Sequence, residues 1–214
     1  MGSSNSTLDQ DAATLLQLAR AMGMSDKWLR RGCGDKVWRW RGIEVDGGRV
    51  VEVNWCGVGL TGNIPEEIGK LSALTYLCLA NNMLQGTLPS ELGSLTALSY
   101  LGLYGNKLNG TLPPQIGNLT SLRALYLDSN KLSGSVSTLA TLSSLTNLSL
   151  TDNNFSDKVP STLKKVSFSK SRSDGRPYTE YLMNKLNETH FASRRKRKCK
   201  TTSPLLNGLP GISN

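Results

Sequence analysis

Hydrophobic and polar positions in the middle of the chain recur with a period of 24 residues, the spacing from Leu74 to Leu98 and from Leu98 to Leu122. The segment 74–96 reads LTYLCLANNMLQGTLPSELGSLT, and leucine, asparagine, glycine and proline return at the same offsets in the next units. Several residue types in register indicate a repeat architecture in which each unit stacks on its neighbours. Long amphipathic helices are excluded, because the recurring asparagine, glycine and proline residues would interrupt them.

The repeat pattern extends over residues 50–168 and divides into five units. The fourth unit is one residue shorter than the others and lacks the proline, and the fifth loses the glycines. The units are 50–73, 74–97, 98–121, 122–144 and 145–168. The pattern weakens at both ends, as is typical of terminal repeats.

The segments outside the repeats have different compositions. Residues 1–8 are small and polar, which predicts a disordered N-terminus. The next segment, 9–49, opens with an amphipathic helix over 9–22, for which Asp9 or Asp11 is the expected N-cap. It continues with a tryptophan-rich stretch and an Asp-Gly-Gly sequence that predicts the turn of a β-hairpin. We interpret this segment as a cap over one open end of the repeat stack.

The repeats resemble plant-type leucine-rich repeats, with the pattern L-x-x-L-x-L-x-x-N-x-L-x-G-x-[IL]-P-x-x-[IL]-G-x-L, over residues 9–168. The resemblance implies an α/β leucine-rich-repeat solenoid: a curved right-handed superhelix with a parallel sheet on its concave face, 3₁₀ turns on its convex side and an N-terminal helical cap. Caps of this family often carry C-x-W-x-G-V-x-C, but Trp38 and Val45 stand where the cysteines would be. The missing cap disulfide favours the cysteine-free relatives in plants, algae and protists over a receptor ectodomain.

One polar column of the repeat is predicted to be structural. An inward asparagine amide has enough donors and acceptors to satisfy the backbone groups that the turn after each strand leaves unpaired. The column consists of Asn82, Asn106, Asn130 and Asn153.

The outward strand positions are left open by the repeat pattern, so they are the candidate binding residues. Four of the six tyrosines fall on them, and tyrosine offers a large, rigid contact area with a polar tip. We therefore predict a partner-binding concave face made of Tyr76, Cys78, Tyr100, Tyr104, Tyr126, Asp128, Asn54, Glu52 and Asn147. The period predicts that Tyr76 and Tyr100 are cross-strand neighbours and that Tyr104 and Tyr126 lie diagonal to one another. The alternative is that these aromatic pairs only stabilise strand pairing.

The cysteines and the N-terminus predict an intracellular protein. Cys56 and Cys78 lie on adjacent predicted strands but in different columns, so we expect free thiols. Residues 1–23 lack the basic and apolar regions of a secretory signal. We therefore expect a cytoplasmic location. Gly2 completes an N-myristoylation pattern, which would add peripheral contact with the plasma membrane.

The net charge of +9 arises entirely from residues after Leu163. Up to Leu163 there are 13 Lys+Arg and 13 Asp+Glu, whereas residues 164–214 hold 12 and 3. Residues 169–214 are predicted to be a mostly disordered basic tail. Its basic run is suited to nuclear localisation, anionic membranes or nonspecific nucleic-acid contact, or is simply solvated. The run consists of Arg194, Arg195, Lys196, Arg197, Lys198 and Lys200.

No catalytic chemistry is recognisable in the repeats. The single histidine, His190, lies in the tail, so the repeats offer no imidazole base. Phosphate-binding, dinucleotide-binding and kinase signatures are absent from the sequence, and no metal-ligand spacing occurs. We therefore predict a non-enzymatic monomer without metal or cofactor.

The predicted function is recognition of a protein or peptide through the concave sheet face, in signalling or defence. Two alternatives stay open. The chain is a truncated or kinase-less member of a leucine-rich-repeat receptor family at the plasma membrane, or it is an enzyme inhibitor built from the same repeats.

Overall fold

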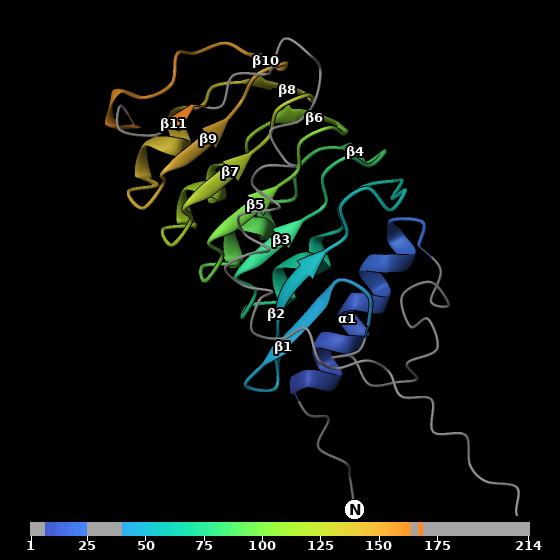
Figure 1. The fold of residues 1–214 in the computed structure, drawn as a ribbon. Helices are drawn as coiled ribbons and strands as arrows, with labels where there is room; N and C mark the ends of the chain where they lie inside the picture. Colours follow the sequence, from blue (N-terminus) through green and yellow to red (C-terminus); the bar gives the residue numbers. More distant parts are fainter. Residues whose placement is uncertain (1–6, 25–39, 164–166, 169–214) are drawn as a thin grey trace, which may run out of the picture. The chain divides into compact units, whose positions relative to one another are not determined.

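A computed structural model of the protein describes residues 7–24, 40–163 and 167–168 (Figure 1). A helix and a hairpin come first: α1 (Thr7–Ala21), β1 (Ile43–Asp46) and β2 (Arg49–Asn54). Strands of the first sheet then recur once per repeat: β3 (Tyr76–Cys78), β5 (Tyr100–Gly102), β7 (Ala124–Tyr126), β9 (Asn147–Ser149) and β11 (Ser167–Phe168). Short strands of a second sheet alternate with them: β4 (Gln85–Gly86), β6 (Lys107–Thr111), β8 (Lys131–Gly134) and β10 (Asn154–Phe155).

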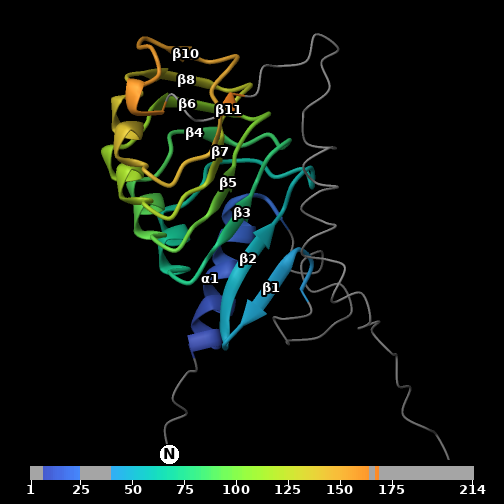
Figure 2. The ribbon, with the colours of Figure 1, turned by 60° about the vertical axis from the view of Figure 1, so that its left-hand side comes forward.

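The strands form two sheets. The first has seven strands in the order β1-β2-β3-β5-β7-β9-β11, parallel except for the antiparallel β1–β2 pair. The second has four parallel strands in the order β10-β8-β6-β4. On the side opposite the seven-stranded sheet lie 3₁₀ turns (Figure 2). They are η2 (Glu66–Lys70), η3 (Ser90–Ser94), η4 (Pro114–Asn118), η5 (Ser137–Thr141) and η6 (Ser161–Leu163). This arrangement confirms the predicted solenoid with its N-terminal helix.

The prolines of the repeat set the starts of the convex turns. Pro65, Pro89 and Pro113 each stand immediately before a 3₁₀ turn, with φ of −81°, −69° and −64°. The pyrrolidine ring holds φ in this range and the missing N–H is not needed at the first residue of a turn. The fourth repeat has no proline at this point, and η5 follows Val136 instead.

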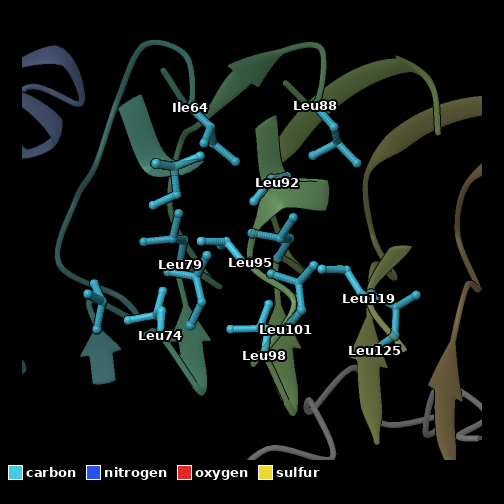
Figure 3. Packing of buried hydrophobic residues seen from close by; sticks show 14 of the residues in the cluster. Ile64, Leu74, Leu79, Leu88, Leu92, Leu95, Leu98, Leu101, Leu119 and Leu125 are labelled. Carbon is cyan, nitrogen blue, oxygen red and sulfur yellow. The ribbon is translucent and has the colours of Figure 1, made fainter. Parts of the chain in front are cut away.

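Leucines from the strands and from the turns fill the interior. Leu74, Leu98 and Leu122 are fully buried in one core cluster. Figure 3 shows Leu74 beside its counterpart Leu98 in the next repeat. Full burial of one such side chain stabilises the fold by roughly 1.5–3 kcal/mol. The core cluster continues without interruption from Leu15 in α1 to Leu163 in η6. Each repeat therefore depends on its neighbours for burial of its apolar face.

The helix and hairpin close the N-terminal end of this core. The predicted hairpin is confirmed, and its two turn glycines, Gly47 and Gly48, have φ of 55° and 73°, as a two-residue hairpin turn of the I′ type requires. Because α1 begins at Thr7, neither Asp9 nor Asp11 precedes the helix, and the predicted N-cap is wrong.

Asp11 instead anchors the helix to the sheet. Its side chain is 4% exposed and accepts bonds from Arg49 Nε at 2.9 Å and Nη2 at 3.2 Å. The backbone N–H of Val50 donates a third bond at 2.9 Å. A buried carboxylate with an arginine and an amide as donors is well compensated, so this contact fixes α1 against β2.

The asparagine side chains bridge neighbouring repeats. Asn106 Nδ2 donates to Leu79 O and to Leu103 O, both at 3.0 Å, and its Oδ1 accepts from Leu84 N at 3.0 Å. Asn130 and Asn153 repeat this pattern one and two units later. Asn82 lies next to the hairpin, and its Oδ1 accepts three backbone amides of the first repeat.

Replacing Asn106 by alanine tests how much these hydrogen bonds contribute to the stability of the fold. The substitution leaves the Leu84 amide without its acceptor, while Leu79 O and Leu103 O each keep a second donor, Asn82 and Asn130. We therefore expect a loss of about 1–3 kcal/mol in the free energy of unfolding. Urea denaturation followed by circular dichroism measures the change. Asn109→Ala is the matched control, because Asn109 is exposed on β6; equal losses in both variants would contradict the structural role of the column.

Candidate binding face

Four tyrosines gather on the seven-stranded sheet, on the side that points away from the leucine core. Tyr76 is the register partner of Tyr100, and their rings stack with centroids 4.3 Å apart at an interplanar angle of 10°. Tyr126 continues the contact: its ring lies 5.6 Å from that of Tyr100 and 6.5 Å, edge-on, from that of Tyr104. The predicted cross-strand and diagonal neighbours are confirmed. We call Tyr76, Tyr100, Tyr104 and Tyr126 the tyrosine cluster.

The cluster is less accessible than the sequence suggested. Tyr100, Tyr104 and Tyr126 are only 9%, 4% and 7% exposed, although none of them belongs to the core cluster. Tyr76 keeps more of its surface and is half-buried. Burial raises the pKa of Tyr100 and Tyr76 above the usual tyrosine range and that of Tyr126 to about 12. The phenols therefore stay protonated and serve as hydrogen-bonding groups on an apolar floor.

Two half-buried carboxylates lie at either side of the tyrosine cluster. Glu52 on β2 is the register partner of Tyr76, and Glu44 lies opposite it on β1. Burial first, and repulsion from Glu44 second, raise the pKa of Glu52 to about 7. Asp128 follows β7, and burial likewise raises the pKa of its carboxyl, while a hydrogen bond from Ser149 acts in the opposite direction.

The polar residues of the predicted face have defined local partners. Asn54 makes a side-chain hydrogen bond with Glu52, which lowers the pKa of that carboxyl. Asn147 Oδ1 accepts a bond of 2.8 Å from Thr146 Oγ1 at the start of β9. Both asparagines are half-buried. They flank the tyrosine cluster on β2 and β9, so the structure places the predicted residues on one sheet.

Cys78 departs from the prediction. Its side chain is fully buried and forms a disulfide with Cys56, with the two Cα atoms 5.6 Å apart. The expectation of free thiols is wrong. It assumed that Cys56 continues straight along its strand, whereas β2 ends at Asn54 and a turn follows. Trp55 N donates to Cys78 O and Gly57 N to Ala80 O, so the chain at Cys56 stays against β3. That Cα separation is normal for a disulfide. Cys78 therefore links the first two repeats covalently and is not a contact residue of the face.

In residues 7–24, 40–163 and 167–168 no group of three His, Cys, Asp or Glu side chains is placed to hold a metal ion. Across those same ranges no helix has the length and apolar character needed to cross a bilayer. Gly2, His190 and the basic run 194–200 lie outside the described residues, as does Trp38.

The fold and this face define a class of protein: a leucine-rich-repeat domain of the ectodomain type, which is typically a non-catalytic binding module. The family described as leucine-rich repeat region matches residues 48–170, more than half of the chain. The chain therefore belongs to the leucine-rich-repeat family, of the plant type.

The similar proteins include plant receptor kinases. A probable LRR receptor-like serine/threonine-protein kinase of Arabidopsis thaliana is 31% identical over an alignment of 78 residues, with coverage of 33% of this chain and 9% of that kinase. The crystal structure of the LRR ectodomain of the receptor kinase SOBIR1 from the same plant is 32% identical, with a TM-score of 0.65, covering 74% of this chain and 89% of that one.

A second similar structure is a complex. It is the LRR ectodomain of the plant membrane receptor kinase GASSHO1/SCHENGEN3 from Arabidopsis thaliana in complex with CASPARIAN STRIP INTEGRITY FACTOR 2. The identity is 30% and the TM-score 0.68, with coverage of 74% of this chain and 20% of that one.

These comparisons correct the expected location. The cytoplasmic assignment is wrong, since the matched structures are ectodomains of plant receptor kinases and point to an extracellular or membrane-associated location. The Cys56–Cys78 disulfide agrees with the correction, because disulfides persist in oxidising compartments.

The disulfide should be detectable and stabilising. Its cysteines are 22 positions apart, and closing a loop of that size in the unfolded chain corresponds to about 3 kcal/mol. We expect Cys56→Ser/Cys78→Ser to lower the free energy of unfolding by about that amount. Peptide mapping by mass spectrometry without reduction checks the bond directly; recovery of both cysteines as alkylated thiols from the native chain would contradict it.

Glu52 should make stability depend on pH. Its folded pKa, about 7, lies above the ordinary value of 4.5, so its favourable contribution is complete below pH 4.5 and is lost as the pH rises through 7. We therefore expect Glu52→Gln to be more stable than the native chain at pH 8 by about 1–2 kcal/mol, allowing for partial solvent exposure. The difference should shrink towards pH 4. Thermal unfolding at both pH values measures it, with Glu66→Gln, on an exposed 3₁₀ turn, as control.

Proposed function

We propose that this chain is a non-catalytic recognition domain that binds a protein or peptide partner on the outward face of its seven-stranded sheet. The domain serves a receptor-like protein at the cell surface, where partner binding starts a signalling or defence response. The leucines, the asparagine column and the prolines build the stack, so the outward strand positions are the ones available for recognition.

The stacked tyrosine cluster is the observation that carries this proposal. Four aromatic side chains lie on positions that the core does not use, and half-buried polar groups surround them. An aromatic centre with a polar rim is the common anatomy of a protein-binding surface. Strand pairing alone needs no such concentration, since β9 carries no aromatic residue and still pairs with β7.

The similar structures support the same kind of partner. The GASSHO1/SCHENGEN3 ectodomain was crystallised in complex with CASPARIAN STRIP INTEGRITY FACTOR 2, and it shares this fold. Since the chain covers 20% of that ectodomain, the support concerns the class of partner and not its identity.

Tyr76→Ala tests the proposal, because Tyr76 is the most accessible ring of the cluster. Peptides about twelve residues long, selected from a phage-displayed random library on the full chain, serve as probes. We expect Tyr76→Ala to weaken their binding at least about tenfold, as truncation of an aromatic contact at the centre of an interface does. Fluorescence anisotropy of the labelled peptides measures the affinity.

Met83→Ala is the control for this experiment. Met83 is 48% exposed and lies in the segment between β3 and β4, not at one of the strand positions of the predicted face. Its substitution should leave the affinities unchanged. Equal peptide affinity in native and Tyr76→Ala chains, with the same thermal unfolding midpoint, would rule this face out as the binding surface.

A further inference from the structure

Resting on the proposed function, we propose that the partner of this face is a cationic peptide segment. Its lysine or arginine side chains bind beside Glu52 and Asp128, and the chain between them crosses the tyrosine cluster.

The distribution of charge carries the first step. The nine residues of the predicted face include two carboxylates, Glu52 and Asp128, and no lysine or arginine. Of the nearby cations, Arg49 at the start of β2 is paired with Asp11, and Arg123 lies immediately before β7. Glu44 opposite Glu52 and Asp152 near Asp128 add negative charge at the same two places. Electrostatic complementarity therefore favours a positively charged partner and disfavours an acidic one.

The exposed lysines of the repeats lie elsewhere. Lys107 and Lys131 are exposed on β6 and β8 of the four-stranded sheet. The two sheets of the solenoid thus differ in charge: one presents carboxylates around aromatic rings, the other presents ammonium groups. A basic partner is therefore attracted to the seven-stranded sheet and not to the four-stranded sheet.

The aromatic floor suits the same chemistry. A guanidinium or ammonium group is attracted to the face of a tyrosine ring within about 6 Å, and arginine also stacks on it. Tyr76 lies beside Glu52 in the register of β2 and β3, so one cation can contact both groups. The buried rings of Tyr100 and Tyr126 lower the local dielectric and strengthen attraction to the carboxylates.

The register also sets a spacing. Glu52 shares a row with Tyr76, Tyr100 and Ala124 across three strand intervals, and Asp128 lies four residues after Ala124, just past the end of β7. With strands about 4.8 Å apart and about 3.3 Å per residue, the two carboxylates are separated by about 20 Å. An extended peptide covers this distance in about six residues. The face therefore fits two basic residues about six positions apart.

The state of the carboxylates supports a bound cation. Burial and Glu44 from β1 raise the pKa of Glu52, Asn54 on its own strand lowers it, and Tyr76 faces it from β3. Burial raises the pKa of Asp128. A hydrogen bond with Ser149 on β9 lowers this pKa, and the charge of Asp152 raises it. A cation beside either group would lower its pKa and offset the cost of burial. Carboxylates kept in such surroundings are characteristic of binding and catalytic sites.

The test compares peptides selected on three forms of the full chain from a random phage-displayed library. One form is native, one is Glu52→Gln/Asp128→Asn, and the control is Glu66→Gln/Asp157→Asn, which removes two exposed carboxylates outside this face. We expect native and control chains to enrich peptides with Lys or Arg about six positions apart. The peptides should bind the first double variant roughly tenfold more weakly and the control within about twofold.

The outcomes separate this inference from the proposed function. Selected peptides that are not enriched in Lys or Arg, or that bind Glu52→Gln/Asp128→Asn as tightly as the native chain, would overturn the cationic preference. If those same peptides lose affinity for Tyr76→Ala, the face still binds peptides and only the charge preference is wrong. If Tyr76→Ala leaves all affinities unchanged, the proposed function itself fails.

Discussion

Each strand of the solenoid ends in a turn whose backbone amides and carbonyls cannot pair within their own repeat. The side chain of one asparagine per repeat forms hydrogen bonds with these groups. Asn106 reaches carbonyls of two successive strands and an amide of the returning chain. The residue before each member of the column has a left-handed backbone: Asn81, Gly105, Ser129 and Asp152 have φ between 54° and 65°. A buried irregular backbone is stable only when such groups are satisfied, so the leucine stack depends on this bridge.

Because the stack is held from inside, the outward positions can carry groups that do not stabilise the fold. Glu52 is an example: burial beside Glu44 raises its pKa to about 7 and costs stability above that pH. The stacked rings of Tyr76 and Tyr100 lie on the same side of the sheet, outside the leucine core. Selection for recognition can keep side chains that lower the stability of a domain. Such side chains around aromatic residues are typical of a binding surface.

The period of the sequence predicted the leucine core, the parallel strands and the 3₁₀ turns, because the backbone of the repeat dictates leucine, asparagine and proline at fixed positions. It also placed Tyr76 against Tyr100, since register follows from the period. It missed the Cys56–Cys78 disulfide, which depends on the path of the chain after β2. Asp11 was also missed as a partner of Arg49, 38 residues away, because no period relates the two. The predicted location was wrong partly because it relied on free thiols at Cys56 and Cys78.

The claim that recognition belongs to the outward face of the seven-stranded sheet can be tested directly by solution NMR. A peptide selected on the native chain would be titrated into the labelled full chain, and amide shifts would be followed residue by residue. We expect the largest changes in β2, β3, β5 and β7, around Glu52, Tyr76 and Asp128. Changes confined to the four-stranded sheet β4, β6, β8 and β10, or to the 3₁₀ turns, would contradict it.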